Sequence, residues 1–250
     1  MKNIYILTTE DPLYSKNIIQ EIYNKFPENI TGVGLSGGLI TFKRILLSPL
    51  IYGFYNYIIF GIKILYGKFY RGKIEKFCIS KKIRVDVLPS VKDGKLYEIL
   101  IKEKVDLLIL INCSRKLFLR EIEAPSYGTI NIHFGDLPKY RGLMTILHAI
   151  RLNEKENGIT IHYVNKDLDS GKILDKEFVP IYINDNLLSI WHRSTEKSKV
   201  MLVEIINKIF SHELIKTKEN LDDLSNYFSF PSLIDILHYR WTLLKKRFFE

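Results

Sequence analysis

Short apolar runs alternate with amphipathic segments along the chain, and this alternation restricts the possible folds more than any other feature of its 250 residues. Apolar runs of strand length occupy residues 4–8, 30–35, 84–88, 106–112, 128–134 and 158–164. Helical spacing of apolar residues covers 14–26, 95–104 and 145–153, and later 187–212 and 231–249. This alternation predicts an α/β fold with an open, mostly parallel, twisted sheet flanked by helices. Ligands of such sheets bind beyond the carboxyl ends of the strands.

The sequence lacks the usual signatures of nucleotide and metal sites. No Gly-x-Gly-x-x-Gly turn follows the first strand, and no Gly-x-x-x-x-Gly-Lys-Ser/Thr stretch occurs. The glycines of 34–38 come after the second strand, so they are a weak dinucleotide signal. Cys78 and Cys113 lie far apart, whereas a zinc site needs clustered ligands. We therefore expect no bound metal, and reduced cysteines in a cytoplasmic protein.

Polar side chains interrupt the strand at 128–134. Asn131 and His133 are two residues apart, so they project from one face of that strand. Asp169 ends the loop after the next strand, and a parallel pairing of the two strands would bring it to the same sheet edge. An amide can stabilise an oxyanion, and a histidine beside a carboxylate can hold a proton near neutral pH. Acyl transfer to an external amine would suit this set, while a satisfied core histidine and a backbone-bonded asparagine remain the alternative.

Three spaced motifs extend this pattern: Asn131-x-His133-x-x-x-Leu137-Pro138-x-Tyr140-Arg141-Gly142, Gly158-x-Thr160-x-His162 and Asp169-x-Gly171-x-Ile173. Together they resemble the 10-formyltetrahydrofolate-dependent formyltransferases, which include glycinamide ribonucleotide, methionyl-tRNA and amino-sugar N-formyltransferases. The resemblance is dense from residue 106 to 174. It implies a Rossmann-like catalytic domain, which we place at 1–184, followed by a helical extension at 185–250.

The resemblance also implies roles for individual residues. Asn131 and protonated His133 would stabilise the oxyanion that forms when an amine attacks the formyl carbon, and Asp169 would hold and polarise His133. The donor, 10-formyltetrahydrofolate, would bind two loops, one offering apolar side chains to the pterin face and the other backbone groups to its edge. These residues are Lys116, Leu117 and Phe118 in the first loop, and Asn165, Lys166, Asp167, Leu168 and Asp169 in the second.

The segment after His133 departs from the family pattern. Gly135-Asp136-Leu137-Pro138 stands where family members commonly have Ser-Leu-Leu-Pro. Asp136 either anchors the amine of the acceptor or serves as a turn or helix-cap residue. With Tyr140 and Arg141 it forms our predicted set of acceptor contacts.

The regions outside the motifs favour one class of acceptor. Methionyl-tRNA formyltransferases add a C-terminal β-barrel, but helical patterns follow Pro180 here. Glycinamide ribonucleotide enzymes have a glycine-rich phosphate loop after the first strand, where this chain has Thr8-Thr-Glu-Asp-Pro12. We expect a nucleotide-linked or lipid-linked amino sugar of surface glycans such as lipopolysaccharide. Glycinamide ribonucleotide, methionyl-tRNA and a non-catalytic folate- or sugar-binding role stay open.

An apolar, aromatic segment at 42–71 breaks the α/β pattern. It lies in a stretch without acidic residues between Glu28 and Glu75, in a chain of net charge +9. Pro49, Asn56 and Lys63 interrupt it, so it is too broken to span a bilayer. We predict a helical insert at about 40–78 whose residues 42–73 contact the inner membrane face, with internal packing or a homodimer contact as alternatives. Nucleic acid is not an expected partner, since much of the positive charge is local to this segment and to 245–247. The first nine residues read as a strand rather than a signal peptide.

Overall fold

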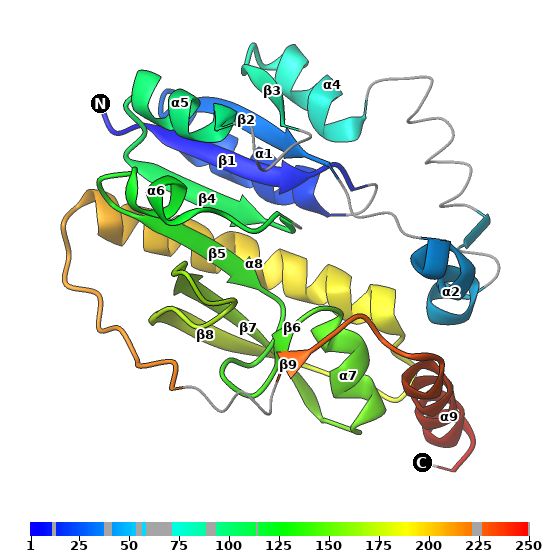
Figure 1. The fold of residues 1–250 in the computed structure, drawn as a ribbon. Coiled ribbons are helices and arrows are strands. Elements are labelled where there is room, and N and C mark those ends of the chain that lie inside the picture. Colours follow the sequence, from blue (N-terminus) through cyan, green and yellow to red (C-terminus); the bar gives the residue numbers. More distant parts are fainter. Residues whose placement is uncertain are drawn as a thin grey trace.

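A seven-stranded sheet forms the centre of the molecule in the computed structural model, which describes residues 1–11, 14–37, 42–53, 57–58, 72–88, 94–113, 115–221 and 227–249 (Figure 1). The strand order is β3-β2-β1-β4-β5-β7-β8. The bounds are β1 Ile4–Thr9, β2 Ile30–Ser36, β3 Val85–Leu88, β4 Leu107–Ile111, β5 Thr129–His133, β7 Glu156–Tyr163 and β8 Ile173–Pro180. The first five strands of this order are parallel, which confirms the predicted open and mostly parallel sheet.

Helices cover both faces of the sheet. Alternate residues of β1 belong to two separate apolar clusters: Ile4 and Ile6 to one, and Tyr5 and Leu7 to the other. The first cluster receives side chains from α1 (Ser15–Lys25), α4 (Lys73–Ser80), α7 (Thr145–Arg151) and α8 (Leu187–Phe210). The second receives side chains from α5 (Lys95–Lys102) and α6 (Leu119–Glu123). Burial on both faces explains why β1 and β4 are continuous apolar runs.

The C-terminal part of the chain packs on the same body. The buried face of α8 shares the first cluster with the sheet, so the division into 1–184 and 185–250 stays a prediction. The last helix, α9 (Leu233–Phe249), adds Ile236 and Tyr239 to that cluster and lies beside α7 (Figure 1). A two-stranded ladder joins β6 (Arg141–Gly142) to β9 (Tyr227–Phe228), two short elements that the sequence patterns do not reveal.

One expectation about the strands was wrong, and one strand was missed. β7 runs antiparallel to β5, although we expected parallel neighbours, and β8 at Ile173–Pro180 was not predicted. A run that is buried on both faces does not show the direction of its strand. β8 is an edge strand, and the charged residues Asp175, Lys176 and Glu177 in its middle interrupt the apolar pattern by which a strand is predicted.

Part of the apolar insert is described. Helix α2 occupies Phe42–Tyr52 and includes Pro49, while most of 54–71 lies outside the described residues. Helix α4 is the last helix of the connection from β2 to β3, with Ile74 and Cys78 fully buried. In the described part of the chain, every helix is too short or too polar to traverse a bilayer.

Candidate active site

The carboxyl end of β5 carries the first two predicted catalytic residues. Asn131 is half-buried, and its Nδ2 donates to Nε2 of His162 at 3.1 Å. His133 is 7% exposed, and its Nε2 lies 2.6 Å from the carbonyl oxygen of Tyr140. A carbonyl can only accept, so Nε2 of His133 carries a hydrogen and Nδ1 is left to face Asp169.

Asp169 approaches the same place from the loop after β7. Its Oδ2 accepts the backbone N–H of Gly142 at 2.9 Å and lies 3.7 Å from Nδ1 of His133. Its Oδ1 lies 3.8 Å from Nε2 of His162. The carboxylate therefore sits between two imidazoles, and the structure brings the three predicted catalytic residues together.

The route by which Asp169 reaches the site differs from the expected one. Because β7 is antiparallel to β5, its carboxyl end lies beside the start of β5, where Ile130 pairs with Tyr163. The loop turns back from there, and Asp169 has a left-handed backbone with φ of 50°. A Cβ at Gly171 would lie 1.8 Å from the carbonyl oxygen of Tyr163, so only glycine permits this tight return.

His162 also belongs to this candidate site, although its place in the Gly158-x-Thr160-x-His162 motif does not reveal a role. Its Nδ1–H donates to the carbonyl oxygen of Tyr163 at 2.8 Å, which leaves Nε2 to accept from Asn131. Burial lowers the pKa of His162 to about 4; the charge of Asp169 opposes this shift, and that of His133 adds to it. A neutral His162 thus fixes the direction of the Asn131 amide. The sequence feature that could have pointed to His162 is its position two residues after Thr160, on the same face of a strand.

Thr160 anchors the loop that follows β5. Its side chain is fully buried, and its Oγ1 donates to the carbonyl oxygen of Gly135 at 2.7 Å and accepts the N–H of Leu137 at 3.3 Å. A Cβ on Gly135 would lie 2.6 Å from Nε2 of His133, so this position has no room for a side chain. Thr160 pairs with His133 across the two strands. The imidazole is thereby held by its own strand, the loop and the neighbouring strand.

The three predicted acceptor contacts have partners within the protein. Oδ1 of Asp136 lies 2.7 Å from Nζ of Lys176 on β8, in a half-buried ion pair. The hydroxyl of Tyr140 donates to Glu154 at 2.8 Å, and burial raises its pKa. Arg141 is buried and donates to Asn220 at 3.0 Å. Contact of these three residues with an acceptor stays a prediction.

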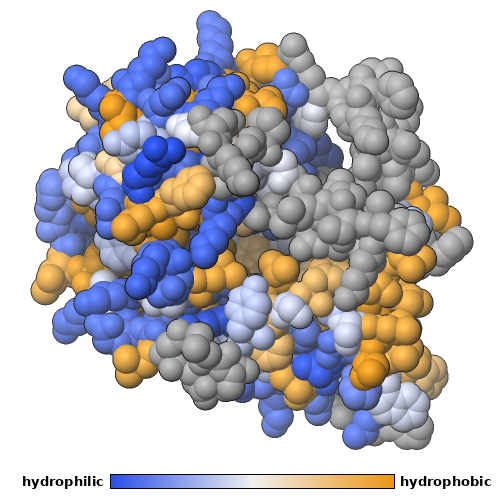
Figure 2. Space-filling model, in the orientation of Figure 1, coloured by the Kyte–Doolittle hydropathy of each residue, from blue (hydrophilic) through white to orange (hydrophobic). Residues whose placement is uncertain are grey.

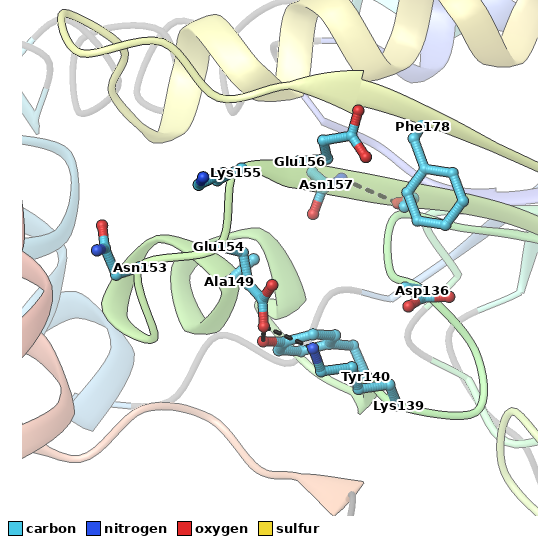
Figure 3. Close-up of a pocket in the computed structure, with 11 residues that line it drawn as sticks. Asp136, Lys139, Tyr140, Ala149, Asn153, Glu154, Lys155, Glu156, Asn157 and Phe178 are labelled. Carbon is cyan, nitrogen blue, oxygen red and sulfur yellow. Dashed lines mark hydrogen bonds and ion pairs between the residues drawn. The ribbon is translucent and has the colours of Figure 1, made fainter.

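A hollow of about 390 Å³ lies next to this loop, between the end of α7 and the start of β7 (Figure 3). Asp136 and Tyr140 line it, whereas none of the three predicted catalytic residues does. Glu154 points toward Tyr140 and Lys139 in the close-up, and the phenyl ring of Phe178 lies across the opening from them. The other lining residues are Ala149, Asn153, Lys155, Glu156, Asn157 and Gly158.

A buried ion pair stabilises the first predicted folate loop. Arg115 and Glu121 are 2.6 Å apart with side chains 3% and 0% exposed, and Glu121 also accepts the N–H of Phe118 at 2.9 Å. Lys116 and Phe118 are exposed, and Leu117 is buried. Such a loop can offer an aromatic face to a ligand without rearranging.

The second predicted folate loop begins beside the same apolar cluster. Val164, which precedes it, packs against the cluster that contains Leu117. The side chains of Asn165, Lys166, Asp167 and Leu168 are exposed, which leaves the backbone of the loop accessible. Oδ1 of Asn165 accepts from the N–H of Asp167 and the hydroxyl of Ser170, so the loop has its own internal hydrogen bonds. Donor binding by the two loops remains a prediction. Among the described residues, no cluster of His, Cys, Asp and Glu side chains could bind a metal ion.

Comparison with known proteins decides the family. The family model described as "Formyl transferase" matches residues 72–206, which is more than half of the chain. This chain belongs to the formyl transferase family. The match includes the three catalytic candidates and both predicted folate loops.

Relatives within the formyl transferase family differ in their acceptors. A methionyl-tRNA formyltransferase of Kosmotoga olearia is 34% identical over 131 residues, which cover 52% of this chain and 42% of that protein. The chain therefore spans less than half the length of this curated relative. An N-formyltransferase from Helicobacter canadensis, solved with folinic acid and dTDP-3-aminofucose, has a TM-score of 0.63 at 18% identity, with 100% of this chain and 81% of that chain covered. Phosphoribosylglycinamide formyltransferase of Anaplasma phagocytophilum has a TM-score of 0.66 at 17% identity, with 92% and 99% covered. These structural likenesses concern the fold.

Proposed function

We propose that this protein is an N-formyltransferase that uses 10-formyltetrahydrofolate as the donor. The main support is that Asn131, His133 and Asp169 lie together at the end of β5. Nδ1 of His133 is 3.7 Å from Oδ2 of Asp169, and the hydrogen bond to His162 fixes the direction of the Asn131 amide. Membership of the formyl transferase family supports it. A neutral amide donor beside an imidazole and a carboxylate suits a reaction that creates an oxyanion and moves one proton.

The residues would act in sequence. The acceptor amine attacks the formyl carbon, a carbon–nitrogen bond forms, and the carbonyl oxygen becomes an oxyanion. Asn131 and protonated His133 stabilise that oxyanion, while the charge of Asp169 stabilises the imidazolium. The bond from the formyl carbon to N10 then breaks, and the proton lost by the amine passes to N10. Because burial keeps His162 neutral, it does not compete with His133 for the charge of Asp169.

For the acceptor, we propose the amine of a nucleotide-linked amino sugar in surface glycan synthesis. The segment after β1 supports this choice over glycinamide ribonucleotide. Asp11 accepts the N–H groups of Tyr14 and Ser15 at 2.8 and 3.1 Å, so a carboxylate already occupies the N-terminus of α1. Glu10 accepts the N–H of Ile74 at the start of α4 at 3.1 Å. These two carboxylates occupy helix N-termini at which a phosphate would otherwise bind, and their negative charge would repel a phosphate.

The structural neighbours are consistent with an amino sugar. The Helicobacter canadensis enzyme was solved with dTDP-3-aminofucose, and its likeness extends over the whole chain, including α8 and α9. These two helices follow the catalytic residues in this chain. The position of the amine on the sugar and the identity of the nucleotide are open within this proposal.

Methionyl-tRNA is the second candidate acceptor. The observation in its favour is the 34% identity with the Kosmotoga olearia enzyme over 131 residues. A protein that bound tRNA through its positive charge would lose affinity steeply with added salt, whereas a nucleotide sugar held by a few contacts would lose little.

The decisive experiment offers the three acceptors side by side. The protein is incubated with 10-formyltetrahydrofolate and, separately, with a panel of nucleotide-linked amino sugars, glycinamide ribonucleotide and methionyl-tRNA, and tetrahydrofolate release is followed. We expect release with an amino sugar only. His133→Ala and Asp169→Asn should lower turnover by about 10²–10⁴-fold, whereas His238→Ala, which alters an exposed histidine of α9, serves as the matched control.

The outcomes separate the parts of the proposal. Release with methionyl-tRNA alone would replace the acceptor and keep the chemistry. Undiminished turnover in His133→Ala would refute the assigned mechanism. Donor binding without release with any acceptor would favour a non-catalytic relative. Contact of residues 42–73 with the inner membrane face of the cell, a cytoplasmic location and a homodimer are further proposals that these assays do not address.

A further inference from the structure

Helix α9 presents an apolar stripe to solvent on the side away from the core. Its core side includes Ile236, Tyr239 and Leu243, and Lys246 is also buried. Five large apolar side chains on the other side are between 49% and 72% exposed. They are Ile234, Leu237, Trp241, Leu244 and Phe248, and their spacing of three and four residues confines them to an arc of about 80° on a helix of 3.6 residues per turn. Single exposed apolar residues are ordinary, but a continuous stripe of five on one helix indicates a binding surface.

Positive side chains border this stripe on both sides. On the same helical wheel, Arg240 and Arg247 fall on one flank and Lys245 on the other. No acidic residue lies between Asp235 and Glu250. An apolar face that includes Trp and Phe, with basic residues along its margins, is the composition of helices that lie in a membrane interface.

Helix α2 continues the same surface. It packs against α9, and Nε of Arg240 donates to the carbonyl oxygen of Leu50 at 2.6 Å. Leu46 and Leu50 of α2 are 63% and 42% exposed. The hydropathy view shows apolar side chains gathered where α2 and α9 lie, at the lower right of the molecule (Figure 2).

The sequence and the fold agree on the charge of this surface. Helix α2 comes from the stretch without acidic residues between Glu28 and Glu75, and α9 comes from the one between Asp235 and Glu250. The fold places these two distant stretches side by side. Arg240 and Arg247 also line a hollow of about 420 Å³ between α2, α9 and residues 183–188, which offers room for an anionic headgroup; Asp185 lines it too, but its carboxylate is paired with Arg193.

We propose that the exposed faces of α9 and α2 form one docking surface for an anionic lipid membrane. Charge complementarity selects this occupant over a second copy of the chain. The spacing along α9 would also suit a coiled-coil seam, but paired copies would bring cations against cations along both flanks. Anionic headgroups would neutralise the same cations while the stripe enters the acyl boundary. This surface is independent of the formyl-transfer proposal, and it extends the membrane contact expected of residues 42–73 to the C-terminal helix.

Vesicle flotation tests the proposal with the full chain. The probes are phosphatidylcholine vesicles with and without about 30% phosphatidylglycerol, at about 0.05 M and 0.5 M salt. We expect flotation with the anionic vesicles at low salt and its loss at high salt or without the anionic lipid. Trp241→Glu should lower vesicle binding at least tenfold, and Lys245→Glu with Arg247→Glu on the order of fivefold or more. Leu214→Glu is the matched control, because Leu214 is 89% exposed and lies outside both helices.

Fluorescence gives a second readout that does not depend on a charged variant. The chain has two tryptophans, so in Trp191→Phe the emission reports Trp241 alone. Its emission should shift to shorter wavelength when anionic vesicles are added. Absence of flotation at low salt, or equal flotation of Trp241→Glu and the wild-type protein, would overturn the proposal. A wild-type dimer that Trp241→Glu converts to a monomer, without vesicle binding, would assign the surface to a second copy instead.

Discussion

The buried imidazole of His162 should make the fold sensitive to acid over a defined pH range. Burial lowers its pKa from 6.5 to about 4 in the folded protein. Between these values the unfolded chain binds a proton that the folded chain does not, so the free energy of unfolding falls as the pH falls from about 6.5 to about 4. Outside this pH range, His162 does not make the free energy of unfolding depend on pH. At about 1.36 kcal/mol per pH unit, the loss amounts to about 3 kcal/mol.

His162→Gln is the variant that isolates this effect. The amide oxygen of glutamine can accept from Asn131 where Nε2 of the imidazole accepts now, but glutamine does not titrate. Urea unfolding at pH values from 7.5 to 4 gives the free energy of unfolding of both proteins. The wild-type protein should lose about 3 kcal/mol more than the variant over this range. The comparison must be between the two proteins, because burial also lowers the pKa of His148, which adds a loss of the same sign to both.

Equal pH dependence in the wild-type protein and His162→Gln would show that His162 is not held neutral by the fold. A variant that unfolds at pH 7.5 would be replaced by His162→Asn, whose shorter amide fits the same space.

Further changes probe the surroundings of the site. Thr160→Val should cost about 1–3 kcal/mol of stability in urea unfolding and lower kcat, because the loop after β5 loses its buried hydroxyl. Glu121→Gln should destabilise the protein by about 3–5 kcal/mol and raise KM for the folate donor, because Arg115 stays buried without its counter-charge. Lys176→Met should lower the free energy of unfolding by about 1 kcal/mol, because Asp136 loses its ion-pair partner; if Asp136 also anchors the acceptor amine, Asp136→Asn should raise the acceptor KM by more than tenfold, and an unchanged KM would make Asp136 a turn residue.

Most of the sheet could be predicted from local sequence patterns. The runs at 4–8, 30–35, 106–112 and 128–134 became β1, β2, β4 and β5 within one or two residues at each end. Their burial on one or both faces is visible in the sequence as apolar content. Strand direction was not predictable in the same way. The direction in which β7 pairs with β5 depends on the path of the connection between them, which contains β6 and α7, and an apolar run is equally compatible with either direction.

The catalytic candidates were predictable because their motif is local, whereas their supports are not. Asn131 and His133 share a strand, and family resemblance supplied Asp169. His162 acts through its burial, which depends on packing from several elements and has no local signature. The ion pair of Asp136 with Lys176 joins residues that are 40 positions apart, and Lys176 lies on β8, a strand that was itself not predicted.

Asn220 shows how the segment after α8 participates in the site. Its Nδ2 donates to the carbonyl oxygens of Asp169 and Gly171 at 2.9 and 3.0 Å, and its Oδ1 accepts from Arg141 at 3.0 Å. These hydrogen bonds stabilise the turn in which Asp169 has a left-handed backbone, a conformation that costs a non-glycine residue free energy. The neighbouring β9 pairs with Arg141 and Gly142, and Gly142 donates its N–H to the Asp169 carboxylate. The 3.7 Å separation between Asp169 and His133 therefore depends on residues more than 50 positions further along the chain, which no motif around the catalytic candidates would reveal.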